Sequence, residues 1–278
     1  MNGALGVLIF SGSLPATRLA VRDFEPLFLT AARACIAAAV ALALLLLLRQ
    51  PRPTLTQLRA LAGVALGVVL GFPLLTALAL RQVDAAHSIV FLGLLPLVTA
   101  ACGVWRGGER PRPAFWAFSA LGSALLLAFA LSRGAGGLLA GDGLMLLAIL
   151  VCGYGYAEGA QLTRQLGGWQ VISWALVLAL PAMAGLAFWQ WPASVAGVHL
   201  SAWLSLGYVS LFSMLIGFVF WYRGLQQGGV AAVSQLQLLQ PLLGLALAAL
   251  LLNETVSAGL LALALALLAC VLGARRFA

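Results

Sequence analysis

Residues 79–112 read ALRQVDAAHSIVFLGLLPLVTAACGVWRGGERPR, and residues 224–257 read GLQQGGVAAVSQLQLLQPLLGLALAALLLNETVS. A shift of 145 residues aligns a proline and a glutamate of the two copies, Pro96 with Pro241 and Glu109 with Glu254. Leucine and alanine matches carry little weight in so apolar a chain, but a proline and a glutamate with the same spacing in both copies do. The two stretches therefore indicate an internal duplication of the chain.

The composition predicts that the whole chain lies in a lipid bilayer. Of its 278 residues, 63% are hydrophobic and 8% are charged, whereas a soluble domain carries about 25% charged residues. All fifteen basic residues are arginines, and almost all of them lie between apolar runs. The net charge of +8 is therefore interpreted as a membrane-topology signal and not as a nucleic-acid surface.

Ten apolar segments approach or exceed the length of about 20 helical residues that crosses the hydrocarbon core. They are 3–21, 25–48, 58–80, 84–105, 114–132, 142–162, 168–190, 200–222, 229–252 and 256–274. Several loops between them are only a few residues long, so neighbouring helices must be antiparallel. The sequence predicts an all-α membrane protein of ten transmembrane helices.

The arginines also predict the side of the membrane on which each loop lies. If the N-terminus is cytoplasmic, ten arginines fall on the inner side and four on the outer side, which is the positive-inside pattern. Both termini are then cytoplasmic, and residues 1–135 and 136–278 hold five helices each. Because five is odd, the second half must be inverted relative to the first. A 5+5 inverted-topology repeat is an architecture of secondary transporters.

The ten helices, the inverted halves and the Pro-x12-Glu elements resemble the EamA-type members of the drug/metabolite transporter superfamily. Pro26 followed by Arg33 is similar to the P-x6-R element of that family, and Ser11-Gly12 lies where a W-G or S-G pair is usual. The second half departs from the pattern, with Trp174 where an arginine would be expected. The expected aromatic lining is similar to that of YddG-type amino-acid exporters.

This resemblance implies a monomeric secondary carrier in the cell inner (plasma) membrane. It also implies a central cavity built by helices 1, 3, 4, 6, 8 and 9, with helices 5 and 10 at the periphery.

Polar side chains open the ninth predicted helix, where they would be costly in lipid. They are Ser234, Gln235, Gln237 and Gln240, directly before Pro241. This face should point to a cavity, where neutral amides suit a zwitterion or a hydroxyl better than a net charge. Hydrogen bonding to a neighbouring helix is the alternative interpretation.

Aromatic side chains divide by their depth in the predicted helices. Those on segments expected to border the cavity are Phe72, Tyr154, Tyr156, Trp174, Phe218 and Tyr222. Aromatic walls with few charges bind flat or apolar groups, although Phe72 and Phe218 could equally face lipid. The tryptophans near helix ends are predicted to lie at the membrane interface; they are Trp105, Trp116, Trp169, Trp189, Trp191 and Trp221.

The duplicated prolines and charges suggest moving and fixed parts. Each proline removes a backbone donor and predicts a kink at which a gate could bend, although such prolines also occur without that role; the candidates are Pro73, Pro96 and Pro241. Glu109 and Glu254 are predicted to be structural parts of two inverted gates. Arg33 needs a partner or a wet cavity, because a buried arginine is costly. A packing anchor to backbone carbonyls is slightly favoured over substrate contact.

The driving force is constrained by what the sequence lacks. No G-x-x-x-x-G-K-S/T loop is present, so we expect no ATP hydrolysis, and we expect no cofactor or metal. The carboxylates are expected near helix ends or the inner interface, which favours exchange or uniport. His87, in the first turn of the fourth predicted helix, is the candidate for proton coupling or substrate contact, or else an interfacial histidine.

The sequence therefore predicts a secondary transporter that exports small neutral organic solutes, amino acids above all, including aromatic ones. The alternatives within the class are other metabolites or aromatic drug cations, whereas phosphates would require a cluster of basic residues in mid-membrane. An intramembrane serine enzyme using Ser11 or Ser13 with His87 is the alternative from another class, but the inverted duplication has no role in its chemistry.

Overall fold

The computed structural model describes residues 1–79, 82, 91–132, 140–192, 194–240, 242–244, 246–247 and 258–278. All regular elements within these residues are helices, so the predicted all-α class is confirmed. Six helical stretches in this part of the chain are long and apolar enough to cross a membrane: Asn2–Ala20, Pro26–Leu47, Leu55–Ala79, Gly141–Leu166, Gly168–Trp189 and Leu200–Gly228. A shorter apolar stretch covers Pro113–Phe129.

The first half of the chain contributes eight of these helical elements. They are α1 (Asn2–Ser11), α2 (Ser13–Ala20), α3 (Pro26–Leu47), α4 (Leu55–Val64), the π-helix η1 (Ala65–Gly71), α5 (Phe72–Ala79), α7 (Leu95–Gly107) and α8 (Pro113–Ser132).

The second half contributes a matching series. It consists of α9 (Ala140–Leu166), α10 (Gly168–Trp189), α11 (Leu200–Tyr208), the π-helix η2 (Val209–Ile216), α12 (Gly217–Gly228), α13 (Val230–Ser234), the 3-10 helix η3 (Gln235–Leu239) and α15 (Ala258–Phe277).

The same 145-residue shift relates the helix boundaries of the two halves. It carries η1 onto residues 210–216, which lie inside η2, and it carries the first residues of α4 and α5 onto those of α11 and α12. It also carries α8 onto residues 258–277, which are the bounds of α15. Because π-helices are rare, one at the same place in each half supports the duplication independently of residue matches.

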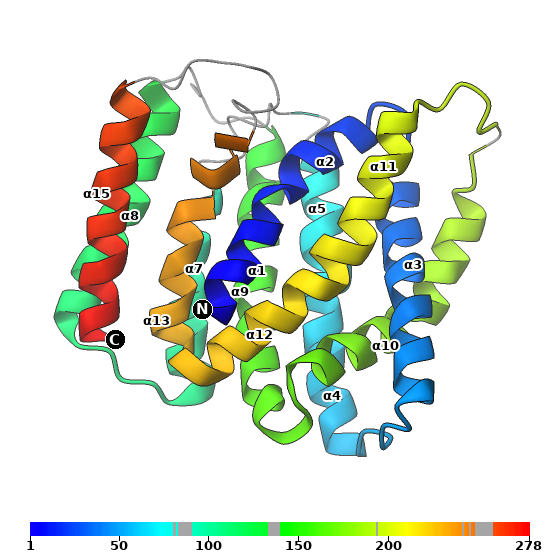
Figure 1. Cartoon of the computed structure of the whole chain (residues 1–278), viewed down its shortest axis with the longest axis horizontal. Helices are drawn as coiled ribbons and strands as arrows, with labels where there is room; N and C mark the ends of the chain where they lie inside the picture. Colours follow the sequence, from blue (N-terminus) through cyan, green and yellow to red (C-terminus); the bar gives the residue numbers. More distant parts are fainter. Residues whose placement is uncertain are drawn as a thin grey trace.

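The related helices run in opposite directions (Figure 1). In that view α4, η1 and α5 lead upward, whereas α11, η2 and α12 lead downward; α8 leads upward, and α15 beside it leads downward. The pair α8 and α15 forms one edge of the molecule, and α3 packs on α10 toward the other edge. The described helices of the two halves are thus arranged with inverted direction.

Small residues let η1 approach α9 closely. A Cβ atom at Gly67 would lie 2.9 Å from the Gly155 Cα atom and 3.1 Å from its nitrogen. The neighbouring Gly63 and Gly71 face side chains of the same helix, Tyr154 and Val151. The glycines at every fourth position therefore allow backbone-to-backbone packing, as is usual between membrane helices.

Replacing Gly67 by leucine is expected to destabilise the protein, because the new side chain would meet the backbone of α9. Overpacking of this kind costs about 1–3 kcal/mol or more, which thermal unfolding of the detergent-purified protein would show. Gly185→Leu is the matched control, since a Cβ atom at Gly185 in α10 meets nothing within 4 Å. Equal melting temperatures for the two variants would contradict the close packing of η1 on α9.

Candidate functional site

A cavity lies between the two halves of the chain, with a volume of about 50 Å³. The described residues that line it are Phe10, Ser13, Leu14, Thr17, Arg33, Val68, Phe72, Pro73, Thr76, Leu92, Leu95, Tyr156, Ser213, Phe218 and Gln240. This volume holds a few water molecules, whereas pockets for organic ligands measure about 300–1,000 Å³. The cavity must therefore widen before it can hold an organic solute.

The lining contains pairs of residues related by the 145-residue shift. The pairs are Val68 with Ser213, Pro73 with Phe218, and Leu95 with Gln240. In two of these pairs the first half supplies an aliphatic side chain and the second half a polar one. The cavity therefore lies where corresponding elements of the two repeats meet, which is the usual place of a binding site in transporters built from repeats.

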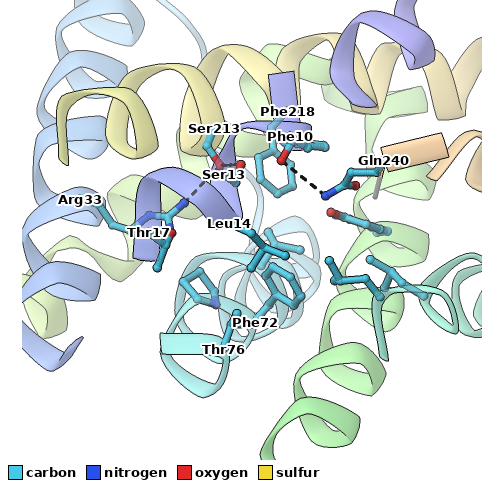
Figure 2. Close-up of a pocket in the computed structure, with 15 residues that line it drawn as sticks. Phe10, Ser13, Leu14, Thr17, Arg33, Phe72, Thr76, Ser213, Phe218 and Gln240 are labelled. Carbon is cyan, nitrogen blue, oxygen red and sulfur yellow. Dashed lines mark hydrogen bonds between the residues drawn. The ribbon is translucent and has the colours of Figure 1, made fainter. Parts of the chain in front are cut away.

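Arg33 brings a charge to this cavity from α3. Its Nη2 atom donates hydrogen bonds to the Val209 carbonyl oxygen at 3.2 Å and to the Ser213 hydroxyl at 3.3 Å. Ser213 also accepts a hydrogen bond of 2.7 Å from Ser13. Figure 2 shows the guanidinium directed to the two serines, with Gln240 across the cavity. The expected contact with a backbone carbonyl is present, and Arg33 lines the cavity as well.

An aromatic wall covers part of the cavity, next to this polar group. The Phe10 and Phe218 rings meet edge to face, with centroids 5.1 Å apart, and the Tyr156 ring lies 5.9 Å from Phe218. Phe72 lines the cavity from α5 (Figure 2). The structure thus places Phe72 and Phe218 on the cavity, as the sequence-based interpretation preferred for the second half of its list.

The other predicted aromatic residues lie away from the cavity lining. Tyr154 packs near Trp105, with ring centroids 6.2 Å apart. Tyr154 and Tyr156 are neighbours in sequence but point to different sides of α9, because successive helical residues are rotated by about 100°. Tyr222 is fully buried and donates a hydrogen bond of 3.1 Å to the Gly155 carbonyl. Trp174 packs against the main core cluster.

Only one of the polar residues that open the ninth predicted helix lines the cavity. This residue is Gln240, whose amide nitrogen donates a hydrogen bond of 3.4 Å to the Phe10 carbonyl. Ser234, Gln235 and Gln237 are buried outside the lining. Ser234 donates to the Ala231 carbonyl of its own helix at 2.9 Å, and the Gln235 amide lies 3.5 Å from the Ser234 hydroxyl. Their contact with substrate stays a prediction.

The prolines occupy different structural positions. Pro73 lines the cavity in α5, just after η1. Pro96 lies in the first turn of α7, because a turn at residues 93–94 precedes that helix. A proline at a helix start costs no hydrogen bond, so Pro96 begins a helix there and does not kink its interior. His87, Pro241 and Glu254 lie outside the described residues, and their roles stay predictions.

Contacts between the halves hold one end of the molecule together. Arg106, in the last turn of α7, forms two hydrogen bonds to the Glu158 carboxylate of α9, at 2.7 and 2.9 Å. Glu109 accepts hydrogen bonds from the backbone nitrogens of Val230 at 2.7 Å and Ala231 at 2.8 Å. These nitrogens belong to the first turn of α13, where backbone donors otherwise lack partners. Glu109 of the first copy thus caps a helix in the second copy.

Removing this cap is expected to loosen the start of α13. Loss of an N-terminal capping group costs about 0.5–2 kcal/mol, so Glu109→Ala should speed hydrogen–deuterium exchange of the segment 229–234 by roughly two- to thirtyfold. Glu109→Gln keeps an acceptor and should have a smaller effect. Arg110→Ala, at an exposed position of the same loop, is the control. Unchanged exchange in Glu109→Ala would show that the cap does not stabilise this turn.

The opposite end has a contact of its own between the halves. Asp23, in the loop after α2, accepts a hydrogen bond of 2.9 Å from the His199 backbone nitrogen, and its carboxylate lies 2.9 Å from the His199 Nδ1 atom. The backbone hydrogen bond is the main cause that lowers the pKa of Asp23. The predicted solvent exposure of His199 is confirmed, since 77% of its side chain is accessible.

The interfacial assignment of Trp221 is wrong. This side chain is fully buried and packs against Phe10 and Tyr156, with centroid distances of 6.1 and 5.4 Å. Trp105 and Trp189, by contrast, are exposed. A position near a helix end does not distinguish a membrane-facing ring from one that fills the space between two helices.

The two serines of the enzyme alternative have other hydrogen-bond partners. Ser11 donates to the Val7 carbonyl of its own helix at 2.7 Å, and Ser13 donates to Ser213. Within the described residues neither hydroxyl is hydrogen-bonded to a histidine or a carboxylate, so the arrangement of a nucleophile with its base is not seen there.

Comparisons with known proteins agree with this architecture. The EamA-like transporter family matches the chain twice, over residues 1–131 and 139–275. A protein of Bacillus subtilis (strain 168), "Uncharacterized transporter YdeK", is 63% identical over 278 residues, which are all of this chain and 97% of that protein. A solved crystal structure with 22% sequence identity superposes with a TM-score of 0.77 over 98% of this chain and 95% of its own, which supports the fold. The chain therefore belongs to the EamA-like transporter family.

Proposed function

We propose that this transporter is a secondary carrier that exports small organic solutes of no net charge, amino acids above all. In this proposal ten helices cross the inner (plasma) membrane as a 5+5 inverted repeat, with both termini in the cytoplasm. The solute passes through the cavity between the repeats, which opens alternately to the two sides.

The observation that carries the proposal is the placement of the cavity between equivalent elements. Three pairs of residues related by the 145-residue shift line it, and the π-helices η1 and η2 supply one of these pairs, Val68 and Ser213. Because the two halves run in opposite directions, a rearrangement in one half that opens one end has a counterpart in the other half that opens the other end. Alternating access follows from this symmetry.

The chemistry of the lining favours an amino acid. The wall combines aromatic rings with neutral polar groups, namely Ser13, Thr17, Thr76, Ser213 and Gln240. Such a lining can bury an apolar side chain and hydrogen-bond a polar head. An aromatic cation would be repelled by Arg33, and one guanidinium gives little support to a phosphate, which is usually bound by several cationic or backbone donors.

The contacts at the α7 end support a closed inner gate. By the arginine count this end faces the cytoplasm, and there Arg106 with Glu158 and Glu109 with α13 join the two halves. Opening toward the cytoplasm requires α7 to separate from α9 or α13, which breaks these contacts. Substrate binding must supply the free energy for that step.

Counterflow in proteoliposomes tests the proposal. Vesicles loaded with unlabelled L-phenylalanine should accumulate external labelled L-phenylalanine transiently, with saturable kinetics, and vesicles without the protein should not. The same assay with other neutral amino acids, an aromatic cation and a nucleoside compares the competing substrate classes. Exchange of the cation or nucleoside without exchange of any amino acid would contradict the amino-acid proposal.

A further inference from the structure

Arg33 is a buried charge without a described counter-charge. Its exposed fraction is 8%, and its hydrogen bonds are those to Val209 and Ser213. No carboxylate among the described residues forms an ion pair with it, and its Nε atom has no hydrogen-bond partner. A guanidinium has five N–H donors, so most of its capacity to donate is unused within the described protein.

This arrangement is costly unless something else completes it. Burying a charge without its partner costs several kcal/mol, and the two hydrogen bonds of Nη2 recover part of that cost. The unpartnered group belongs to a residue that lines the cavity (Figure 2). A planar anion in the cavity could accept hydrogen bonds from two N–H groups of the fork at once, which is the geometry of an arginine–carboxylate pair.

The charge is present in one repeat and absent from the other. The 145-residue shift carries Arg33 to Leu178 of α10, an exposed side chain. Its hydrogen-bond partner Ser213 likewise corresponds to the aliphatic Val68, which lines the cavity at the related place. The cavity therefore has one cationic end and one aromatic wall, and a solute with an acidic head and an apolar tail would bind in a single orientation.

We propose that Arg33 binds the carboxylate of the transported solute, and that the solute class is therefore carboxylates with an apolar or aromatic side chain. This inference rests on the proposed carrier function and names the group that the site recognises. The Ser13–Ser213 hydrogen bond fixes the serine that holds Nη2, and the rings of Phe10, Tyr156 and Phe218 receive the apolar part. Arg33 thus serves as the polar anchor of the binding site.

A competition panel in the counterflow assay tests the carboxylate directly. Against labelled L-phenylalanine, unlabelled L-phenylalanine and 3-phenylpropionate should compete, whereas L-phenylalaninamide should compete roughly 10- to 100-fold more weakly, the range expected for losing a hydrogen bond to a charged group. In Arg33→Gln this difference should fall below about threefold. Arg22→Gln, which changes an exposed arginine, should keep it. Equal competition by amide and acid in the wild-type protein would overturn the proposal.

A second measurement separates this inference from the transport proposal. The melting temperature of the detergent-purified protein should rise with 3-phenylpropionate and not with 3-phenylpropionamide, and the rise should be lost in Arg33→Gln and smaller in Arg33→Lys. Absence of L-phenylalanine exchange together with this shift would contradict the transport of that amino acid and support the anchor. Absence of any difference between acid and amide in the wild-type protein would overturn the anchor, even if L-phenylalanine is exchanged.

Discussion

Thr76→Phe is expected to lower solute exchange at least tenfold while the protein stays folded and inserted. Thr76 is buried on α5 and lines the cavity, and its hydroxyl has no hydrogen-bond partner among the described residues. Replacing it therefore breaks no described hydrogen bond, and the phenyl ring takes up the space of about 50 Å³ that a solute must enter. Initial counterflow rates, normalised to the amount of reconstituted protein, measure the effect.

Two matched variants show whether the ring acts by filling the cavity. Thr76→Val removes the hydroxyl and keeps the size, so it should retain most of the exchange. Leu66→Phe places the same ring on η1 at a side chain that is 64% exposed, and it should exchange at the wild-type rate. Full activity of Thr76→Phe, with the protein folded, would show that the solute does not pass through this cavity.

Arg106→Ala is expected to destabilise the described conformation through the group it leaves behind. The Glu158 side chain is 8% exposed and loses both of its hydrogen bonds from the guanidinium. Breaking a fully buried pair costs about 3–5 kcal/mol, and the 41% exposure of the Arg106 side chain lowers this estimate to about 1–3 kcal/mol. The melting temperature should fall by several degrees.

The reciprocal variant shows that the unpaired carboxylate is the cause. Changing Glu158→Gln in the Arg106→Ala background removes the buried charge, so the double variant should melt closer to the wild-type protein than Arg106→Ala does. Arg164→Ala, on the same helix as Glu158 at an exposed position, should have little effect. If the double variant melts no higher than Arg106→Ala, the pair does not hold α7 to α9 by its charge.

The sequence was sufficient for those features that depend on length and repetition. Each described helix overlaps a predicted apolar segment, and the offset found from Pro96 and Glu109 also relates α8 to α15. The offset also contained information on the site that was not used. Applied to Leu95 or Val68, it gives Gln240 and Ser213, and all four line the cavity.

Details that depend on tertiary packing could not be predicted in this way. Hydropathy does not distinguish a π-helix from an α-helix, so η1 and η2 were missed, although they place Val68 and Ser213 at the cavity. The side of α9 that faces the cavity depends on its neighbours, which is why Tyr156 and not Tyr154 lines it. Arg33 was expected to anchor one helix to another, and only the structure showed the cavity beside it.

Access to the cavity from the two sides of the membrane tests the central claim most directly. In a variant with Cys35, Cys102, Cys152 and Cys270 replaced, Thr76→Cys would place one thiol on the cavity, and membrane-impermeant thiol reagents would be added to either side of sealed vesicles. We expect labelling from both sides, slowed by a bound substrate. Arg52→Cys and Val195→Cys, at exposed loop positions, should be labelled from opposite single sides. Labelling of Thr76→Cys from one side alone, with and without substrate, would contradict alternating access through this cavity.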